Sequence, residues 1–249
     1  MSSQSTVTPE DVATFWEDGA VCLRKVFPPD WIAKMTAGIE TSLLHPSPIA
    51  KNPSPGFFYD YINWKNIPQF QDFVFHSPAA DIVKTLLKTR VVTFYFEHVL
   101  VKEPGTLSET PWHQDQSYYP FNGEQACSIW MPVDPVSKET TLRLVKGSHK
   151  WDAEALDYKE IPDISHLPSC AILEWQLEPG DCIVFHMKTI HGAYGNSTEE
   201  RRRVLSTRWF GDDVTFSKKP WEHSPPFFGN LVTGNHPSLA KDLFPVVIS

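Results

Sequence analysis

Apolar side chains recur at helical spacing in three segments of the first third of the chain. The first segment follows Thr8, with Pro9 and two acidic residues behind it, which is typical of a capped helix start, and it stops near Gly19. The second opens at the Pro-Pro-Asp of residues 28–30, and the third runs from Ser77 to Leu87. The first two apolar stripes consist of Val12, Phe15 and Trp16, and of Ile32, Met35 and Ile39.

Most of the remaining apolar segments are short and separated by turns that contain Gly or Pro, which is typical of strands. The predicted strands cover residues 20–26, 91–102, 126–134, 142–146, 171–177, 182–186 and 204–211. Helices followed by a run of strands predict a mainly β (α+β) fold, a barrel-like double sheet with the N-terminal helices packed outside it. We see no repeat or linker, so residues 1–249 are expected to form a single domain.

Residues 45–70 differ from both patterns, because four prolines precede a cluster of aromatic side chains. We expect a long aromatic loop here, and such loops in compact domains are often functional lids. Its residues Tyr59, Tyr61, Asn63 and Trp64 are candidates for contact with a substrate, as are Tyr118 and Tyr119 further along. For each of them the alternative is a packing role.

Composition narrows the function classes. A formal net charge of −8, with Arg201, Arg202 and Arg203 as the only tight basic run, argues against a nucleic-acid partner. No apolar run approaches the ~20 residues of a membrane span, so we expect no membrane partner. The polar first residues resemble neither a signal nor a transit peptide, and the 4 cysteines are scattered as in reduced proteins. A cytoplasmic location is the default expectation, and the sequence gives no indication of oligomeric state.

The chemistry centres on His113 and Asp115, which have one residue between them. On a strand, side chains two residues apart share a face, so these two could hold one metal ion. A single His-x-Asp triplet is common by chance, and a third ligand must come from elsewhere. The downstream candidates are His149, His166, His186 and His191.

His191 is the preferred third ligand, because it follows a strand and opens a small-residue turn, His191-Gly192-Ala193. His186 is its competitor, but it ends an apolar strand, where a structural role is favoured. We expect His149 to brace a turn. Two histidines and one carboxylate with open positions are typical of non-haem Fe(II) oxygenases.

Nearly the whole chain resembles the phytanoyl-CoA dioxygenase family of Fe(II)/2-oxoglutarate enzymes. The segments that carry the resemblance are Val101-Lys102-Glu103-Pro104-Gly105, Thr110-Pro111-Trp112-His113-Gln114-Asp115, Val145-Lys146-Gly147-Ser148-His149, Glu178-Pro179-Gly180-Asp181, and His191-Gly192-Ala193 with Arg202 eleven residues after His191. It implies a double-stranded β-helix, or jelly-roll, fold with iron held by the residues matching the family triad. These are His113, Asp115 and His191.

The resemblance also implies that Arg202 binds 2-oxoglutarate, and that Trp130 and His98 line the pocket of this co-substrate. Strand alternation puts Arg202 on one face with Ser206, and we expect Arg201 and Arg203 on the other face to be solvated. Two positions depart from the family. Ala193 stands where some members use a serine to bind oxoglutarate, and Lys146 stands where proline is common.

The expected activity is hydroxylation of an unactivated carbon of a small-molecule substrate, with dioxygen consumed and succinate and CO2 released. Desaturation or cyclisation is an alternative outcome of the same chemistry. A halogenase is disfavoured, because related halogenases lack the carboxylate that Asp115 provides. A catalytically silent jelly-roll binding domain is the rival from another class, and family resemblance fixes no substrate.

Overall fold

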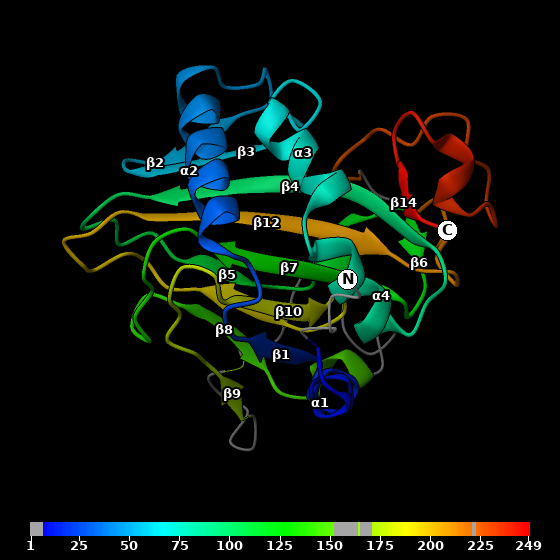
Figure 1. Cartoon of the computed structure of the whole chain (residues 1–249), viewed down its shortest axis with the longest axis horizontal. Coiled ribbons are helices and arrows are strands. Elements are labelled where there is room, and N and C mark those ends of the chain that lie inside the picture. The colour runs from blue at the N-terminus through cyan, green and yellow to red at the C-terminus, as the bar shows by residue number, and fades with distance from the viewer. Residues whose placement is uncertain (1–6, 152–163, 165–170, 221–222) are drawn as a thin grey trace.

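The computed structural model describes residues 7–151, 164, 171–220 and 223–249 (Figure 1). Its helices α1 to α4 span Pro9–Asp18, Pro29–Leu44, Pro68–His76 and Ala79–Leu87. Three of them confirm the helices predicted from apolar spacing. A capping box starts α1, in which the Thr8 side chain accepts from the Asp11 amide and the Asp11 carboxylate accepts from the Thr8 amide. Gly19 ends this helix with φ of 80°, a backbone conformation that favours glycine.

The strands form one large and one small antiparallel sheet, and a two-stranded ribbon. The large sheet has the order β1-β10-β7-β12-β4-β3-β2, with β14 also paired to β4, and the small sheet has the order β5-β11-β8-β9. The ribbon pairs β13 with β6. The strands β1 to β7 span Ala20–Leu23, Lys51–Ser54, Phe57–Tyr61, Val92–Lys102, Thr110–His113, Phe121–Asn122 and Ala126–Pro132. The strands β8 to β14 span Leu142–Val145, Ile172–Leu173, Cys182–His186, His191–Ala193, Arg202–Phe210, Thr215–Phe216 and Val246–Ile248.

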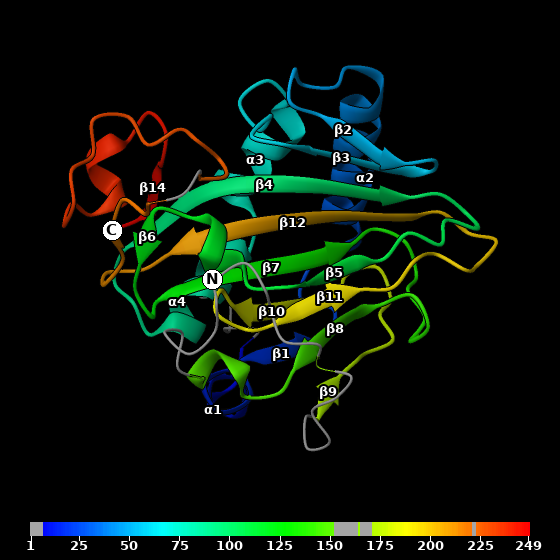
Figure 2. The ribbon, with the colours of Figure 1, turned by 180° about the vertical axis from the view of Figure 1, so that it is seen from behind.

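The two sheets form the layers of a jelly roll, which confirms the predicted fold class. Helices α2 and α4 cover one face of the large sheet, and Figure 2 shows β5, β11 and β8 on the opposite face. The sheets stay separate in the described residues and do not close into a hydrogen-bonded barrel, which corrects the barrel expectation. The C-terminal segment lies beside one end of the large sheet (Figure 1).

Side-chain alternation on the central strands divides the core into two. On β7, Ile129 and Met131 belong to the cluster shared with the helices, whereas Trp130 packs with Leu144 of β8 and Phe185 of β10 between the sheets. Because successive side chains of a strand point to opposite faces, each central strand contributes to both layers. The inner layer leaves room for a cavity between the sheets.

Residues 45–70 are more regular than predicted. They contain β2 and β3, a hairpin at the edge of the large sheet, and the start of α3. Proline was the misleading signal, because a strand that pairs on one side only tolerates Pro53, and Pro68 occupies the first turn of α3. Strand ends also differ, since β1 stops at Leu23 and β9 covers only two residues of the predicted strand 171–177.

The expectations of reduced cysteines and of no membrane span can be compared only with the described residues. Cys22, Cys127 and Cys182 are free thiols, and Cys170 lies outside the described residues. None of the helices in the described part of the chain is long and apolar enough to cross a membrane.

Candidate metal centre and adjoining cavity

The two candidate histidine ligands lie on neighbouring strands of the small sheet. His113 ends β5 and His191 opens β11, and these two residues are direct partners in the antiparallel pair. Their imidazole centroids are 4.2 Å apart. Gly192 allows this approach, because a Cβ at this position would stand 2.9 Å from the Thr110 carbonyl oxygen.

Asp115 reaches the same point by a different route from the one predicted. The strand stops at His113, and Asp115 opens a short 3₁₀ helix, Asp115–Tyr118. Strand alternation was therefore the wrong reason for placing the two side chains together. Asp115 Oδ1 nevertheless lies 3.9 Å from Nε2 of both His113 and His191, and ligand atoms of the three residues lie within 4.8 Å of one another.

Hydrogen bonds hold both imidazoles in one orientation. His113 Nδ1 lies 2.8 Å from the Pro111 carbonyl oxygen, and His191 Nδ1 lies 2.9 Å from that of Thr189. A carbonyl can only accept, so each Nδ1 carries a proton, and Nε2 is the ring nitrogen that faces Asp115. Burial, with repulsion from His113, lowers the pKa of His191 to about 3, which keeps this imidazole in the neutral form that binds metals.

The second carboxylate oxygen of Asp115, Oδ2, interacts with two side chains of the large sheet. Ser128 on β7 donates to Oδ2 at 2.7 Å, and Arg208 Nε on β12 lies 3.5 Å from it. Burial alone would raise the pKa of Asp115, but Arg208, the two histidines and the Ser128 hydrogen bond hold it below its usual range. Asp115 therefore presents one oxygen, Oδ1, as an ionised ligand atom.

His186 is not available as a ligand. The residue is fully buried, its Nε2 lies 2.7 Å from the Glu124 carbonyl oxygen, and its Nδ1 accepts from the Lys188 amide at 3.1 Å. Both ring nitrogens are thus engaged in holding the turn after β10. His149 braces its turn against α1, with Nε2 3.1 Å from the Trp16 carbonyl oxygen, and His166 lies outside the described residues.

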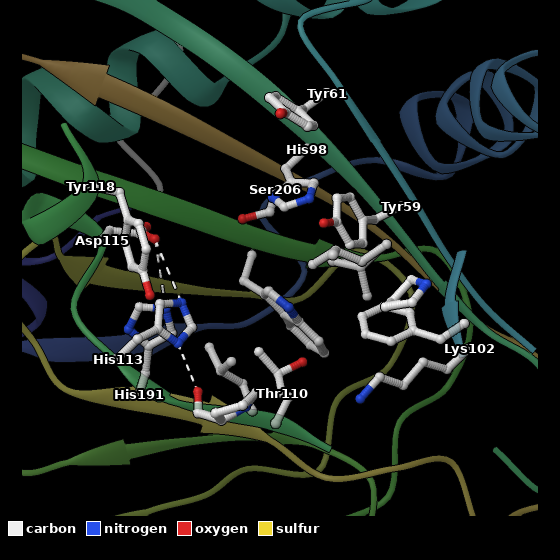
Figure 3. Close-up of a pocket in the computed structure, with 18 of the residues that line it drawn as sticks. Tyr59, Tyr61, His98, Lys102, Thr110, His113, Asp115, Tyr118, His191 and Ser206 are labelled. Carbon is white, nitrogen blue, oxygen red and sulfur yellow. Dashed lines mark hydrogen bonds and ion pairs between the residues drawn. The ribbon is translucent and has the colours of Figure 1, made fainter. Parts of the chain in front are cut away.

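The three ligand candidates open onto a cavity of about 540 Å³ between the sheets (Figure 3). Alternate residues of β12 from its start line it, as strand alternation predicts, and the set consists of Arg202, Val204, Ser206 and Arg208. Trp130 and His98, both expected in the co-substrate pocket, also line this cavity. Nε2 of His98 is buried without a hydrogen-bond partner in the described structure, so the wall offers a free polar atom to a ligand.

Arg202 is buried, with 5% of its surface exposed. Its guanidinium donates to the carbonyl oxygens of Thr140 and Tyr194, and burial lowers its pKa to about 10. Arg201 and Arg203 were predicted to be solvated, but both form ion pairs. Arg201 pairs with Glu40 and Glu103, and Arg203 pairs with Asp134 and Glu40, because the outer face of β12 meets acidic side chains there.

The candidates for substrate contact divide into two groups. Tyr59, Tyr61, Tyr118 and Tyr119 line the cavity. Asn63 and Trp64 are not among the residues that line the cavity. Asn63 donates to Asp60 at 3.3 Å, and Trp64 packs edge-on against Phe94 in the core beneath the helices. Both therefore have the packing role that was their alternative.

Sequence reasoning missed two residues around the centre, Ser128 and Arg208. Arg208 lies an even number of residues after Arg202 on the same strand, so strand alternation could have placed it on the same face. Ser128 gave no signal, because its role depends on how β7 lies against Asp115. Two imidazole nitrogens and one carboxylate oxygen beside a cavity fit a divalent transition metal.

Fold and site together define a jelly-roll protein with a 2-His-1-carboxylate cluster at a cavity between the sheets. The sequence model of the family described as Phytanoyl-CoA dioxygenase (PhyH) matches residues 15–204. The chain therefore belongs to the phytanoyl-CoA dioxygenase family of Fe(II)/2-oxoglutarate enzymes.

Individual relatives are more distant. A probable phytanoyl-CoA dioxygenase from Caenorhabditis elegans is 28% identical over 165 residues, which cover 59% of this chain and 52% of the relative. The chain thus spans about half the length of that protein. The multifunctional dioxygenase ausE of Aspergillus calidoustus is 26% identical over 229 residues, covering 81% of this chain and 73% of the relative.

Solved structures share the fold at lower identity. The non-heme alpha ketoglutarate dependent epimerase SnoN from nogalamycin biosynthesis has a TM-score of 0.80 at 20% identity, covering 96% of this chain and 95% of its own. The carbocyclase SnoK of the same biosynthesis has a TM-score of 0.80 at 21% identity, covering 98% of both chains.

Proposed function

We propose that the chain is an Fe(II)- and 2-oxoglutarate-dependent dioxygenase that hydroxylates an unactivated carbon of a small-molecule substrate. The observation that carries this proposal is the convergence of Nε2 of His113, Nε2 of His191 and Oδ1 of Asp115 at the cavity. Three protein ligands on one side of a metal leave positions for a co-substrate and dioxygen. Membership of the family supports the same assignment.

In this proposal His113, Asp115 and His191 hold the iron, and Arg202 binds the distal carboxylate of 2-oxoglutarate. Trp130 and His98 form walls of the co-substrate pocket. The bound metal and co-substrate together supply an oxidant derived from dioxygen, and succinate and CO2 are released. A guanidinium suits the distal carboxylate because it offers a paired set of donors.

The chain's own residues orient the three ligand side chains for this chemistry. The carbonyl oxygens of Pro111 and Thr189 keep the protons on Nδ1 of the two histidines. Ser128 and Arg208 hold one oxygen of Asp115, so that Oδ1 alone faces the metal position. The aromatic walls place a substrate in a largely apolar space next to the metal, where water is displaced.

A different outcome of the same oxidation, such as cyclisation, is the second candidate, because the similar structure SnoK is a carbocyclase. The experiment that separates them is product analysis under ¹⁸O-labelled dioxygen. Hydroxylation puts one labelled oxygen into the product, whereas cyclisation or desaturation leaves the product unlabelled. In chloride buffer we expect no chlorinated product, because Asp115 occupies the position that a halide needs.

The first test requires no substrate. Purified protein with Fe(II) and 2-oxoglutarate should release succinate slowly when dioxygen is admitted, whereas a catalytically silent binding domain would release none. We also propose that residues 1–249 are one domain, which the similar structures support by covering 96% to 98% of the chain. A cytoplasmic location remains a prediction from the sequence.

A further inference from the structure

Two buried cations face the cavity from neighbouring strands. Lys102 of β4 and Arg202 of β12 are direct partners in the antiparallel register, so their side chains lie side by side on one face. Both line the cavity, and their exposed fractions are only 1% and 5%. Figure 3 shows Lys102 on the other side of the cavity from His113, Asp115 and His191.

The two cationic groups converge on one backbone oxygen. Lys102 Nζ donates to the Tyr194 carbonyl at 2.9 Å, and Arg202 donates to the same carbonyl at 3.3 Å. Lys102 Nζ also donates to the Ser108 carbonyl at 2.6 Å. An ammonium has three N–H donors, so one donor of Lys102 remains for another acceptor.

No acid in the described residues forms an ion pair with either cation. Glu109, whose charge acts on Lys102, is paired with Arg143 instead. Like charges directly opposite one another on neighbouring strands are destabilising, and buried charges normally have a partner of opposite sign. This pair of cations is therefore suited to bind an anion.

We propose that Lys102 and Arg202 together form a receptor for one carboxylate group of a ligand bound in the cavity. The inference rests on the proposed function in one respect, since the distal carboxylate of 2-oxoglutarate is its expected occupant. A carboxylate on the substrate is the other source of the same chemistry. Either one would accept from both cations and neutralise their mutual repulsion.

Protonation should then be coupled to binding. Burial, together with repulsion from Arg202, lowers the pKa of Lys102 to about 7, and Arg143 lowers it further while Glu109 opposes the shift. The Phe57 ring of β3 covers the amine, with its centroid 4.6 Å from Nζ. A bound carboxylate favours the charged ammonium, so binding at pH 8 should take up as much as about one proton per ligand.

The test compares Lys102→Met with wild type in two binding titrations. The probes are 2-oxoglutarate with Fe(II)-loaded protein in the absence of dioxygen, and glutarate, which lacks the keto group, with metal-free protein. Loss of one hydrogen bond to a charged group predicts 2-oxoglutarate binding weakened by about tenfold to a hundredfold, with Fe(II) affinity unchanged. Lys51→Met is the control, because Lys51 is an exposed cation at the cavity wall, and it should change binding less than about twofold.

A second measurement does not depend on the folding of that variant. Calorimetric titration of wild type with each probe at pH 8 in two buffers of different ionisation enthalpy measures proton uptake directly. Lys102→Arg should keep the binding and lose the uptake, because arginine stays charged. A residue that only braced the Ser108 and Tyr194 carbonyls would produce no uptake.

The outcomes separate this inference from the function itself. Dependence of 2-oxoglutarate binding on Lys102, with proton uptake, supports the receptor with the co-substrate as occupant. If wild type binds no 2-oxoglutarate but binds glutarate in a Lys102-dependent way, the proposed function is wrong and the receptor stands. If neither probe depends on Lys102 and wild type takes up no proton, the receptor is wrong even though 2-oxoglutarate binds.

Discussion

The cavity has a metal end, formed by His113, Asp115 and His191, and a cationic end, formed by Lys102 and Arg202. The two ends differ in whether their buried charges are paired within the protein. At the metal end, the charge of Asp115 is met by Arg208 and a Ser128 hydrogen bond, and the histidines are oriented by backbone carbonyls. At the other end, Lys102 and Arg202 lie side by side, and their side-chain hydrogen bonds within the described residues go only to carbonyl oxygens. One end presents three ligand atoms that suit a metal cation, and the other presents two cationic groups that suit an anion. A ligand that chelates a metal at one end and carries a carboxylate at the other fits both.

The largest effect is expected from breaking the metal end. His191→Ala removes a ligand atom, so Fe(II) affinity should fall by more than the roughly 10–100-fold typical of residues that only support a ligand. His186→Ala is the matched control. It loses the hydrogen bonds that hold a turn and should reduce stability while leaving iron binding intact. Anaerobic Fe(II) titration decides, and the reverse pattern would mean that His186 is the ligand.

The next effect comes from breaking the cationic end. Arg202→Ala should weaken 2-oxoglutarate binding by at least roughly a hundredfold, because removing one partner of a buried charge pair costs about 3–5 kcal/mol and each ~1.4 kcal/mol is tenfold. Iron affinity should stay nearly unchanged.

Arg201→Ala and Arg203→Ala serve as controls in that titration. They break ion pairs on the outer face of β12 and should alter 2-oxoglutarate binding little. Equal losses in all three variants would indicate a diffuse electrostatic effect rather than a specific contact.

A milder change tests how the metal end is supported. Ser128→Ala removes the donor to Asp115 Oδ2 and leaves all three ligand residues in place. Iron affinity should decrease by about tenfold and by no more than roughly a hundredfold, the range for partners of metal ligands. Wild-type affinity in this variant would show that Arg208 alone orients the carboxylate.

The smallest effect concerns the pH dependence of stability without ligands. The folded state lowers the pKa of Lys102 to about 7, whereas the unfolded chain keeps the ordinary value near 10.5. Between these values the unfolded state binds more protons, so this lysine makes the protein more stable as pH rises. Wild type should therefore gain roughly 1–2 kcal/mol relative to Lys102→Met between pH 7 and pH 9. Denaturant unfolding measures the difference, and a constant difference across this range would show that Lys102 keeps its ordinary pKa in the folded state.

Local sequence patterns were sufficient for the elements with clear signals. Pro9 after the Thr8 cap marked α1, and apolar runs marked the central strands. They failed for the β2–β3 hairpin, because the cost of a proline in a strand depends on whether a neighbour pairs with it. That is a property of the sheet and cannot be read from residues 45–70 alone.

The candidate site shows the same limit. His113, Asp115 and His191 were predicted as a group, and the structure brings them together, but Asp115 arrives from a 3₁₀ turn instead of a strand. Lys102 was absent from the predicted site because its importance arises from its register opposite Arg202, a hundred residues later in the chain. Spacing along a sequence does not contain that pairing.

The most direct test of the account is an anaerobic titration of Fe(II)-loaded protein with 2-oxoglutarate, followed by the visible absorption of the iron chelate. Wild type should develop the absorption and saturate at one 2-oxoglutarate per iron. His191→Ala should develop none, and Arg202→Ala should reach it only at concentrations higher by at least roughly a hundredfold. An absorption that forms equally in His191→Ala and wild type, or no absorption in wild type, would contradict the assignment of a metal end and a carboxylate end to this cavity.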